Sequence, residues 1–126
     1  MQFTQSFEIT KWDQATYDDS DGINLGKAVV GKTFTGTLEG TSSAELLVVG
    51  TPEGPAAYTA VERFEGSLDG KSGSFVMLHG ATADQTSSPG KILPNTGTGE
   101  LAGLTGTVTY EHDDEGPRLT LDYELA

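Results

Sequence analysis

Three polar side chains on two neighbouring stretches of the chain could support acid–base chemistry. Glu62 and His79 lie in alternating apolar stretches that are joined by a glycine-rich turn, and Tyr58 precedes Glu62 by four residues. If residues 69–72 form the loop, antiparallel pairing places Glu62 opposite His79. A carboxylate beside an imidazole can act as a general acid–base pair or polarise a carbonyl group. We therefore predict Glu62, His79 and Tyr58 as catalytic residues.

The same pairing surrounds these polar groups with large apolar side chains. It sets Leu68 opposite Gly73 and Phe64 opposite Met77, so that side chains two residues apart share the face of Glu62. A mostly apolar surface with a few polar groups is typical of a ligand cavity. Four large side chains are predicted to bind substrate: Trp12, Phe64, Phe75 and Met77.

Two alternatives to this site remain open. In the first, Glu62 and His79 form a cross-strand ion pair with a purely structural role. In the second, a register slip of one residue exchanges the faces of the hairpin. The opposite face, with Val61 and Leu78, is also partly apolar. Either that face is the true interior, or it packs against the chain termini or another copy of the chain, as in a homo-oligomer.

The sequence predicts no metal ion and no cofactor. It has no cysteine, and His79 and His112 are far apart. The acidic stretch at 18–22 lacks the ligand spacing and the distal glutamate of a calcium-binding EF-hand, so we interpret residues 13–22 as a loop. The glycine-rich stretch at 97–103 lacks the lysine and the helix of a phosphate-binding loop. Four aromatic residues either line the mouth of a barrel or belong to its core: Trp12, Tyr17, Tyr110 and Tyr123.

A repeated glycine phrase indicates the elements that must position these residues. The pattern Gly-x-Leu-x-Gly occurs at 36–40, 66–70 and 99–103, each time where an alternating stretch ends, which is typical of a strand entering a hairpin turn. Eight strands are predicted, over residues 3–12, 25–38, 45–49, 58–68, 74–83, 91–98, 103–111 and 118–125. They predict an all-β fold, an eight-stranded antiparallel up-and-down barrel forming a single domain over residues 1–126. An open sandwich is the alternative.

Charge and hydropathy limit the partners. The formal net charge is −12, with 7 basic and 19 acidic side chains, and this composition argues against nucleic-acid binding. No stretch is apolar enough to span a bilayer, and no signal peptide opens the sequence. We therefore expect a cytoplasmic protein that binds neither nucleic acid nor membrane.

Several stretches resemble one bacterial family of uncharacterised proteins, the domain of unknown function 3224. The resemblance rests on residues 32–40, 61–76, 94–106 and 121–125, together with Trp12 and Tyr17. It implies an allene-oxide-cyclase-like barrel that is distantly similar to lipocalins. The wider superfamily and similar small barrels include cofactor-independent cyclases, but none of their motifs aligns here to carry over a catalytic residue.

These observations lead to one functional hypothesis and two alternatives. The hypothesis is a barrel that binds an apolar or amphipathic small molecule and acts as a cofactor-independent cyclase or isomerase of a polyketide- or oxylipin-like compound. One alternative is a non-catalytic carrier or sensor that uses the same pocket. The other is a structural barrel that is filled by its own side chains.

Overall fold

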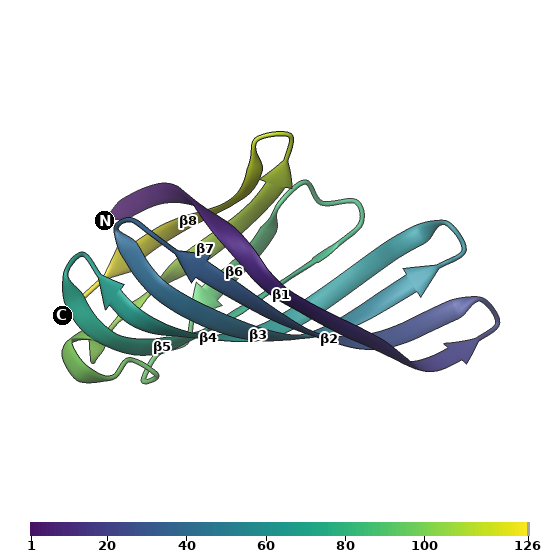
Figure 1. Ribbon diagram of the computed structural model, residues 1–126, viewed down its shortest axis with the longest axis horizontal. Coiled ribbons are helices and arrows are strands. Elements are labelled where there is room, and N and C mark those ends of the chain that lie inside the picture. The colour runs from purple at the N-terminus through teal and green to yellow at the C-terminus, as the bar shows by residue number, and fades with distance from the viewer. Residues whose placement is uncertain (126) are drawn as a thin grey trace.

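Eight antiparallel strands, each paired with the next along the chain, close into a barrel when β8 pairs with β1. The structure is a computed structural model, and it describes residues 1–125 of the predicted domain 1–126. The predicted eight-stranded up-and-down barrel is confirmed, and the open sandwich is wrong (Figure 1). Among the described residues, no helix has the length and apolar character needed to cross a membrane. The elements are β1 (Gln2–Ser20), β2 (Ile23–Phe34), β3 (Leu38–Thr51), β4 (Gly54–Leu68), β5 (Lys71–Thr82), β6 (Ser88–Ile92), the 3₁₀ turn η1 (Gly99–Leu101), β7 (Thr105–Asp113) and β8 (Gly116–Glu124).

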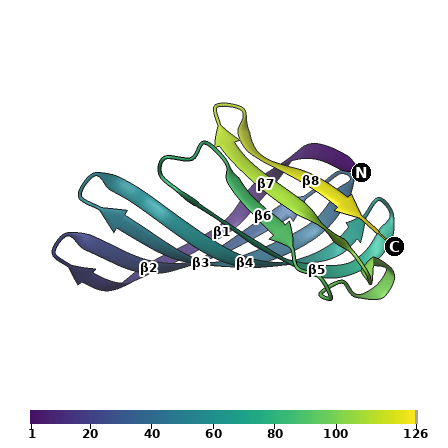
Figure 2. The same ribbon diagram turned by 180° about the vertical axis from the view of Figure 1, so that it is seen from behind.

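The hairpins β1–β2 and β3–β4 extend well beyond the rest of the barrel, as Figures 1 and 2 show. Strand β1 is 19 residues long, so the loop predicted over residues 13–22 is wrong. The turn consists only of Asp21 and Gly22, with φ angles of 57° and 80°. Positive φ at both central residues is the geometry of a type I′ turn, whose twist matches that of the flanking strands. Pairing therefore continues to Ser20 and Ile23.

A β-bulge in β1 decides where Trp12 points. The pairing with β2 shifts between Ile9 and Lys11, and the extra residue of a bulge exchanges the two faces of a strand. Strict alternation predicts Ile9 and Trp12 on opposite faces. The structure instead places both side chains along the same cavity.

The hairpin β4–β5 turns earlier than predicted. Asp69 and Gly70 form a two-residue turn with φ angles of 50° and 80°, so Leu68 pairs with Lys71. The predicted pairs of Glu62 with His79 and of Phe64 with Met77 are therefore wrong. Glu62 pairs with Met77, Phe64 pairs with Phe75, and Ala60 pairs with His79. Because the error is two residues, every side chain keeps its predicted face, and the predicted interior face is confirmed.

The first glycine phrase begins in the predicted hairpin turn, since residues 35–37 connect β2 to β3, and its last glycine has a second role. Gly40 pairs with Gly66 across β3 and β4, and a Cβ on Gly66 would lie 2.1 Å from the Glu39 carbonyl oxygen. These two glycines therefore allow the two backbones to approach closely. The third phrase contains η1 and is not a hairpin turn. Its Leu101 is fully buried and helps to close one end of the barrel.

The barrel interior has a filled half and a hollow half. The filled half contains a cluster of large side chains that includes Phe34, Phe64, Phe75, Met77, Leu101 and Leu121. The other half is lined by smaller residues, with Ala28, Val30, Ala44, Leu46 and Ala60 buried and Val48 and Tyr58 packed against them. Small side chains leave the interior of an eight-stranded barrel unfilled.

Candidate functional site: an open cavity with a polar floor

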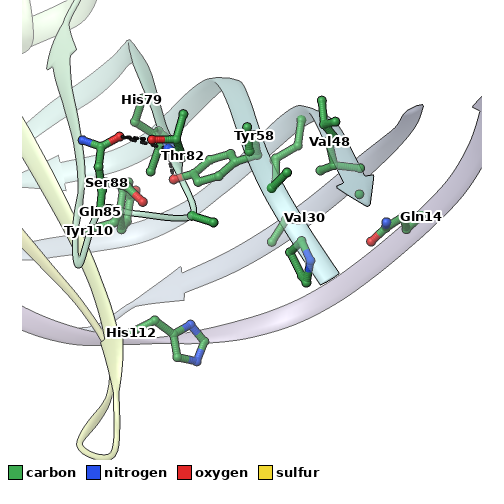
Figure 3. Close-up of a pocket in the computed structure, with 18 of the residues that line it drawn as sticks. Gln14, Val30, Val48, Tyr58, His79, Thr82, Gln85, Ser88, Tyr110 and His112 are labelled. Atoms are coloured by element: carbon green, nitrogen blue, oxygen red, sulfur yellow. Dashed lines mark hydrogen bonds between the residues drawn. The ribbon is translucent and has the colours of Figure 1, made fainter. Parts of the chain in front are cut away.

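The hollow half of the barrel forms a cavity of about 750 Å³ that opens between the long hairpins and the β5–β6 loop. This volume lies within the range of small-molecule sites in proteins. Figure 3 shows Val30 and Val48 on one side of the cavity and Ser88 with Gln85 on the other. Tyr58, His79, Lys32 and Tyr110 also line it. The apolar walls therefore lead to a group of polar side chains, which we call the polar floor: Lys32, Ser42, Tyr58, Glu62, His79 and Tyr110.

Glu62 is the centre of the polar floor. Its carboxylate is fully buried and accepts four hydrogen bonds from four different strands. The donors are Lys32 Nζ at 2.9 Å, Ser42 Oγ at 2.5 Å, His79 Nε2 at 2.7 Å and Tyr110 Oη at 3.0 Å. Charge-assisted hydrogen bonds of this kind stabilise an ionised carboxylate strongly.

The surroundings of Glu62 keep it ionised. Burial by itself raises the pKa of a carboxyl group, but the hydrogen bond from His79 and the charge of Lys32 outweigh it and lower the pKa of Glu62 to about 2. A group with this pKa does not exchange protons near neutral pH. Glu62 also lies beneath the residues that line the cavity, so we assign it a positioning role.

Lys32 brings a positive charge into the barrel. Burial lowers the pKa of its ammonium group, while the charge of Glu62 and the hydrogen bond to it raise the pKa. Nζ lies 4.0 Å from the centre of the Tyr110 ring and 5.3 Å from that of Phe7. These rings stabilise the ammonium group through cation–π interactions.

A chain of hydrogen bonds leads from Glu62 to the cavity. Because the ionised carboxylate can only accept, His79 Nε2 must donate to it. In the neutral ring, Nδ1 is then the acceptor for the Tyr58 hydroxyl at 2.9 Å. Burial raises the pKa of the Tyr58 phenol, the nearby Ser88 hydroxyl lowers it, and the charge of Glu62 raises it. Figure 3 shows Tyr58 and His79 side by side at the cavity.

The three residues predicted to be catalytic lie together, although their direct pairing differs from the prediction. Glu62 contacts His79, and His79 contacts Tyr58. Their catalytic role stays a prediction. The alternative of a purely structural pair is consistent with the burial of Glu62, whereas His79 and Tyr58 both line the cavity.

The four residues predicted to bind substrate divide between the two halves of the barrel. Trp12 lines the open cavity and is 53% exposed. Phe64, Phe75 and Met77 are fully buried in the filled half and do not line the cavity. Alternation placed these three side chains correctly inside the barrel, but it carries no information about depth along the barrel axis.

Sequence reasoning missed three members of the polar floor. Lys32 lies among the inward residues of its strand, between Val30 and Phe34, and a lysine at such a position signals a buried partner. Ser42 was not predicted to face the barrel interior, because the third strand was predicted to begin at residue 45, whereas β3 begins at Leu38. Tyr110, which the sequence places either at the mouth of the barrel or in its core, belongs to the core cluster and lines the cavity at its floor.

The polar floor holds one carboxylate and one imidazole, and residues 1–125 contain no group of three His, Asp or Glu side chains that could bind a metal ion. The side chains of the polar floor can form hydrogen bonds and transfer protons.

Comparison with known proteins agrees with the resemblance noted in the sequence. The profile of the DUF3224 family, described as proteins of unknown function, matches residues 3–125. A crystal structure of a DUF3224 protein of unknown function from Shewanella oneidensis MR-1 is similar, with a TM-score of 0.85 and 30% identity, covering 100% of this chain and 98% of that one. No curated protein matches. The chain therefore belongs to the DUF3224 family.

Proposed function

We propose that this protein binds an apolar or amphipathic small molecule in the open cavity and catalyses a cofactor-independent isomerisation or cyclisation at its polar end. The observation that carries the proposal is the combination of a cavity of about 750 Å³ with the Glu62–His79–Tyr58 hydrogen-bond chain at its floor. The apolar walls would hold a flexible chain in one conformation, which lowers the entropic part of a reaction barrier.

The hydrogen-bond chain suggests a specific proton route. The Tyr58 oxygen would take a proton from the substrate while the Tyr58 hydroxyl proton is transferred to His79 Nδ1, which lies 2.9 Å from that oxygen. The resulting imidazolium would be stabilised by the Glu62 carboxylate, 2.7 Å from Nε2. Return of the proton to a different atom of the substrate completes an isomerisation, and no other reactant is needed.

Ligand binding is testable with the protein's own fluorescence, because Trp12 is the single tryptophan of the chain and lines the cavity. We expect 1-decanol, an uncharged alkyl probe, to change the Trp12 emission in a saturable manner. Val48→Glu should weaken binding about tenfold or more, because it places a charge in the apolar wall. Leu47→Glu is the matched control, since Leu47 is 50% exposed and outside the cavity lining. Equal loss of binding in both variants would contradict the proposed location.

Catalysis is testable without knowing the natural substrate. The proton route predicts that the protein accelerates exchange of the α-hydrogens of 2-nonanone in D₂O, followed by NMR. Tyr58→Phe should slow this exchange about 100-fold, which is the usual contribution of a general acid–base group, and should leave the affinity within about threefold. Tyr17→Phe is the control, since Tyr17 is 62% exposed. This variant should accelerate the exchange of the 2-nonanone α-hydrogens as much as the parent protein does.

A non-catalytic carrier is the second candidate function. It is favoured by the wide mouth of the cavity and by the complete pairing of Glu62, since a carrier needs easy release more than exclusion of water. Saturable binding with no accelerated exchange in the parent protein would support the carrier and reject the enzyme.

A further inference from the structure

We propose that the polar end of the ligand is an uncharged carbonyl group, as in a ketone or an ester, and that the Lys32 ammonium group binds its oxygen. This inference rests on the proposed small-molecule function and names the class of ligand. It also assigns a binding role to a lysine that lies at the bottom of the cavity, 7% exposed.

The first argument is a count of hydrogen-bonding groups at the polar floor. The two oxygens of Glu62 accept from four donors, and His79 Nδ1 accepts from Tyr58. An ammonium group has three N–H donors. Lys32 directs one of them to Glu62 Oε1 at 2.9 Å, and among residues 1–125 the other two have no hydrogen-bond acceptor. The floor therefore offers donors to a ligand, and an oxygen with two lone pairs matches them.

The second argument is charge. Lys32 and Glu62 form a buried ion pair, so their charges compensate before a ligand arrives. The other charged or titratable side chains around the cavity are His79 at the floor, Tyr58 and Tyr110 beside it, and Glu111 and His112 toward the end of β7. A ligand carboxylate would add an uncompensated negative charge to a buried site in a protein of net charge −12. A neutral carbonyl group adds none.

An ammonium ligand fits still less well. It would face the positive charge of Lys32, while the only anionic acceptor at the floor, Glu62, already accepts four hydrogen bonds. The Tyr58 oxygen is a neutral acceptor and does not compensate a second positive charge. A buried cation without a compensating charge is strongly unfavourable.

The third argument is the rigidity of the lysine. Its Nζ is held by Glu62 and lies over the Tyr110 ring at 4.0 Å, with Phe7 at 5.3 Å on another side. Fixed donors lose little conformational entropy when they bind, and aromatic rings reduce competition from water. The carbonyl oxygen would therefore meet a preorganised site. In the proposed reaction, the same contact would stabilise negative charge that develops on this oxygen when a neighbouring C–H loses its proton.

The test compares three probes that each contain nine carbon atoms and differ in the polar group: 2-nonanone, nonanoate and nonylammonium. Binding to the full chain at pH 7.5 is followed by Trp12 emission and by calorimetry. We expect 2-nonanone to bind about tenfold more tightly than either charged probe. We also expect its C=O stretching frequency to fall on binding, because the carbonyl oxygen accepts hydrogen bonds.

Substitution of the lysine provides the decisive comparison. Lys32→Met removes the ammonium group, keeps an unbranched side chain one atom shorter, and should abolish both the preference for the ketone and the frequency shift. Because this variant leaves Glu62 without a counter-ion, the double variant Lys32→Met/Glu62→Leu removes both charges, and circular dichroism checks that each variant is folded. Lys27→Met is the control, since Lys27 lies on the same strand with an exposed side chain, and it should bind like the parent protein.

The outcomes separate this inference from the proposed function. Tighter binding of nonanoate or nonylammonium, equal binding of the three probes, or a ketone preference that survives in the folded Lys32 variants would overturn the carbonyl site and leave the cavity as a ligand site. Failure of all three probes, and of 1-decanol, to bind would overturn both proposals.

Discussion

Replacing Glu62 with leucine is expected to lower the free energy of unfolding by about 3–5 kcal/mol, the usual effect of removing one partner of a buried ion pair. The substitution leaves the Lys32 ammonium group buried without its counter-ion, and it leaves Ser42, His79 and Tyr110 without their acceptor. Chemical denaturation followed by circular dichroism measures the change.

Two further variants make this expectation specific. Glu65 lies on the outer face of the same strand. Glu65→Leu should therefore change the free energy of unfolding by less than about 0.5 kcal/mol, as most surface substitutions do. Lys32→Met/Glu62→Leu should recover much of the lost stability, because it removes both buried charges. A loss of less than about 1 kcal/mol in Glu62→Leu would show that the hydrogen-bond network contributes little to folding.

Acid is expected to destabilise the protein through the same carboxylate. The pKa of Glu62 is about 2 in the folded state and near 4.5 without its partners. Because the folded pKa is the lower one, the stabilisation is fully present above about pH 4.5 and is lost as the pH falls toward 2. The displacement of this pKa corresponds to about 3 kcal/mol.

The measurement is the free energy of unfolding between pH 6 and pH 2.5 for the parent protein and for Glu62→Gln. Asp113, whose pKa the hydrogen bond from Arg118 lowers to about 2, titrates in the same range in both proteins. The difference between the two curves therefore isolates Glu62, and it should shrink by about 3 kcal/mol toward the acid end. Parallel curves would contradict the assignment of the low pKa to this residue.

The fold was largely predictable because strand patterns report which side chains face inward. Glu62 and His79 were predicted on the interior face and lie there, even though their pairing was wrong by two residues. The position of a turn is less certain, since it depends on the φ angles of one or two residues. The Asp69–Gly70 and Asp21–Gly22 dipeptides are both typical of type I′ turns, and two-residue turns at these positions account for the observed register of β4–β5 and for the length of β1.

The cavity was less predictable, because its position depends on the sizes of side chains that meet across the barrel. Phe64 and Phe75 are large apolar side chains of the kind that line ligand cavities. In the structure they instead pack against each other, with ring centres 5.1 Å apart. The hollow adjoins a cluster of small buried residues in which Ala28, Ala44 and Ala60 come together from three strands, and Val30 and Leu46 of this cluster line the cavity. These residues are scattered in the sequence, so their meeting is apparent only once the strand register is known.

The division of the barrel into a filled half and a hollow half has a consequence for how the protein can change. The large side chains that supply most of the apolar burial lie on one side of the polar floor, and the residues that would contact a ligand lie on the other. A substitution such as Val48→Phe, at a half-buried position of the cavity wall, should therefore alter the shape available to a ligand with little loss of folding free energy. Under the proposed function, the cavity wall is therefore the region where substitutions should change ligand preference while the folding core is retained.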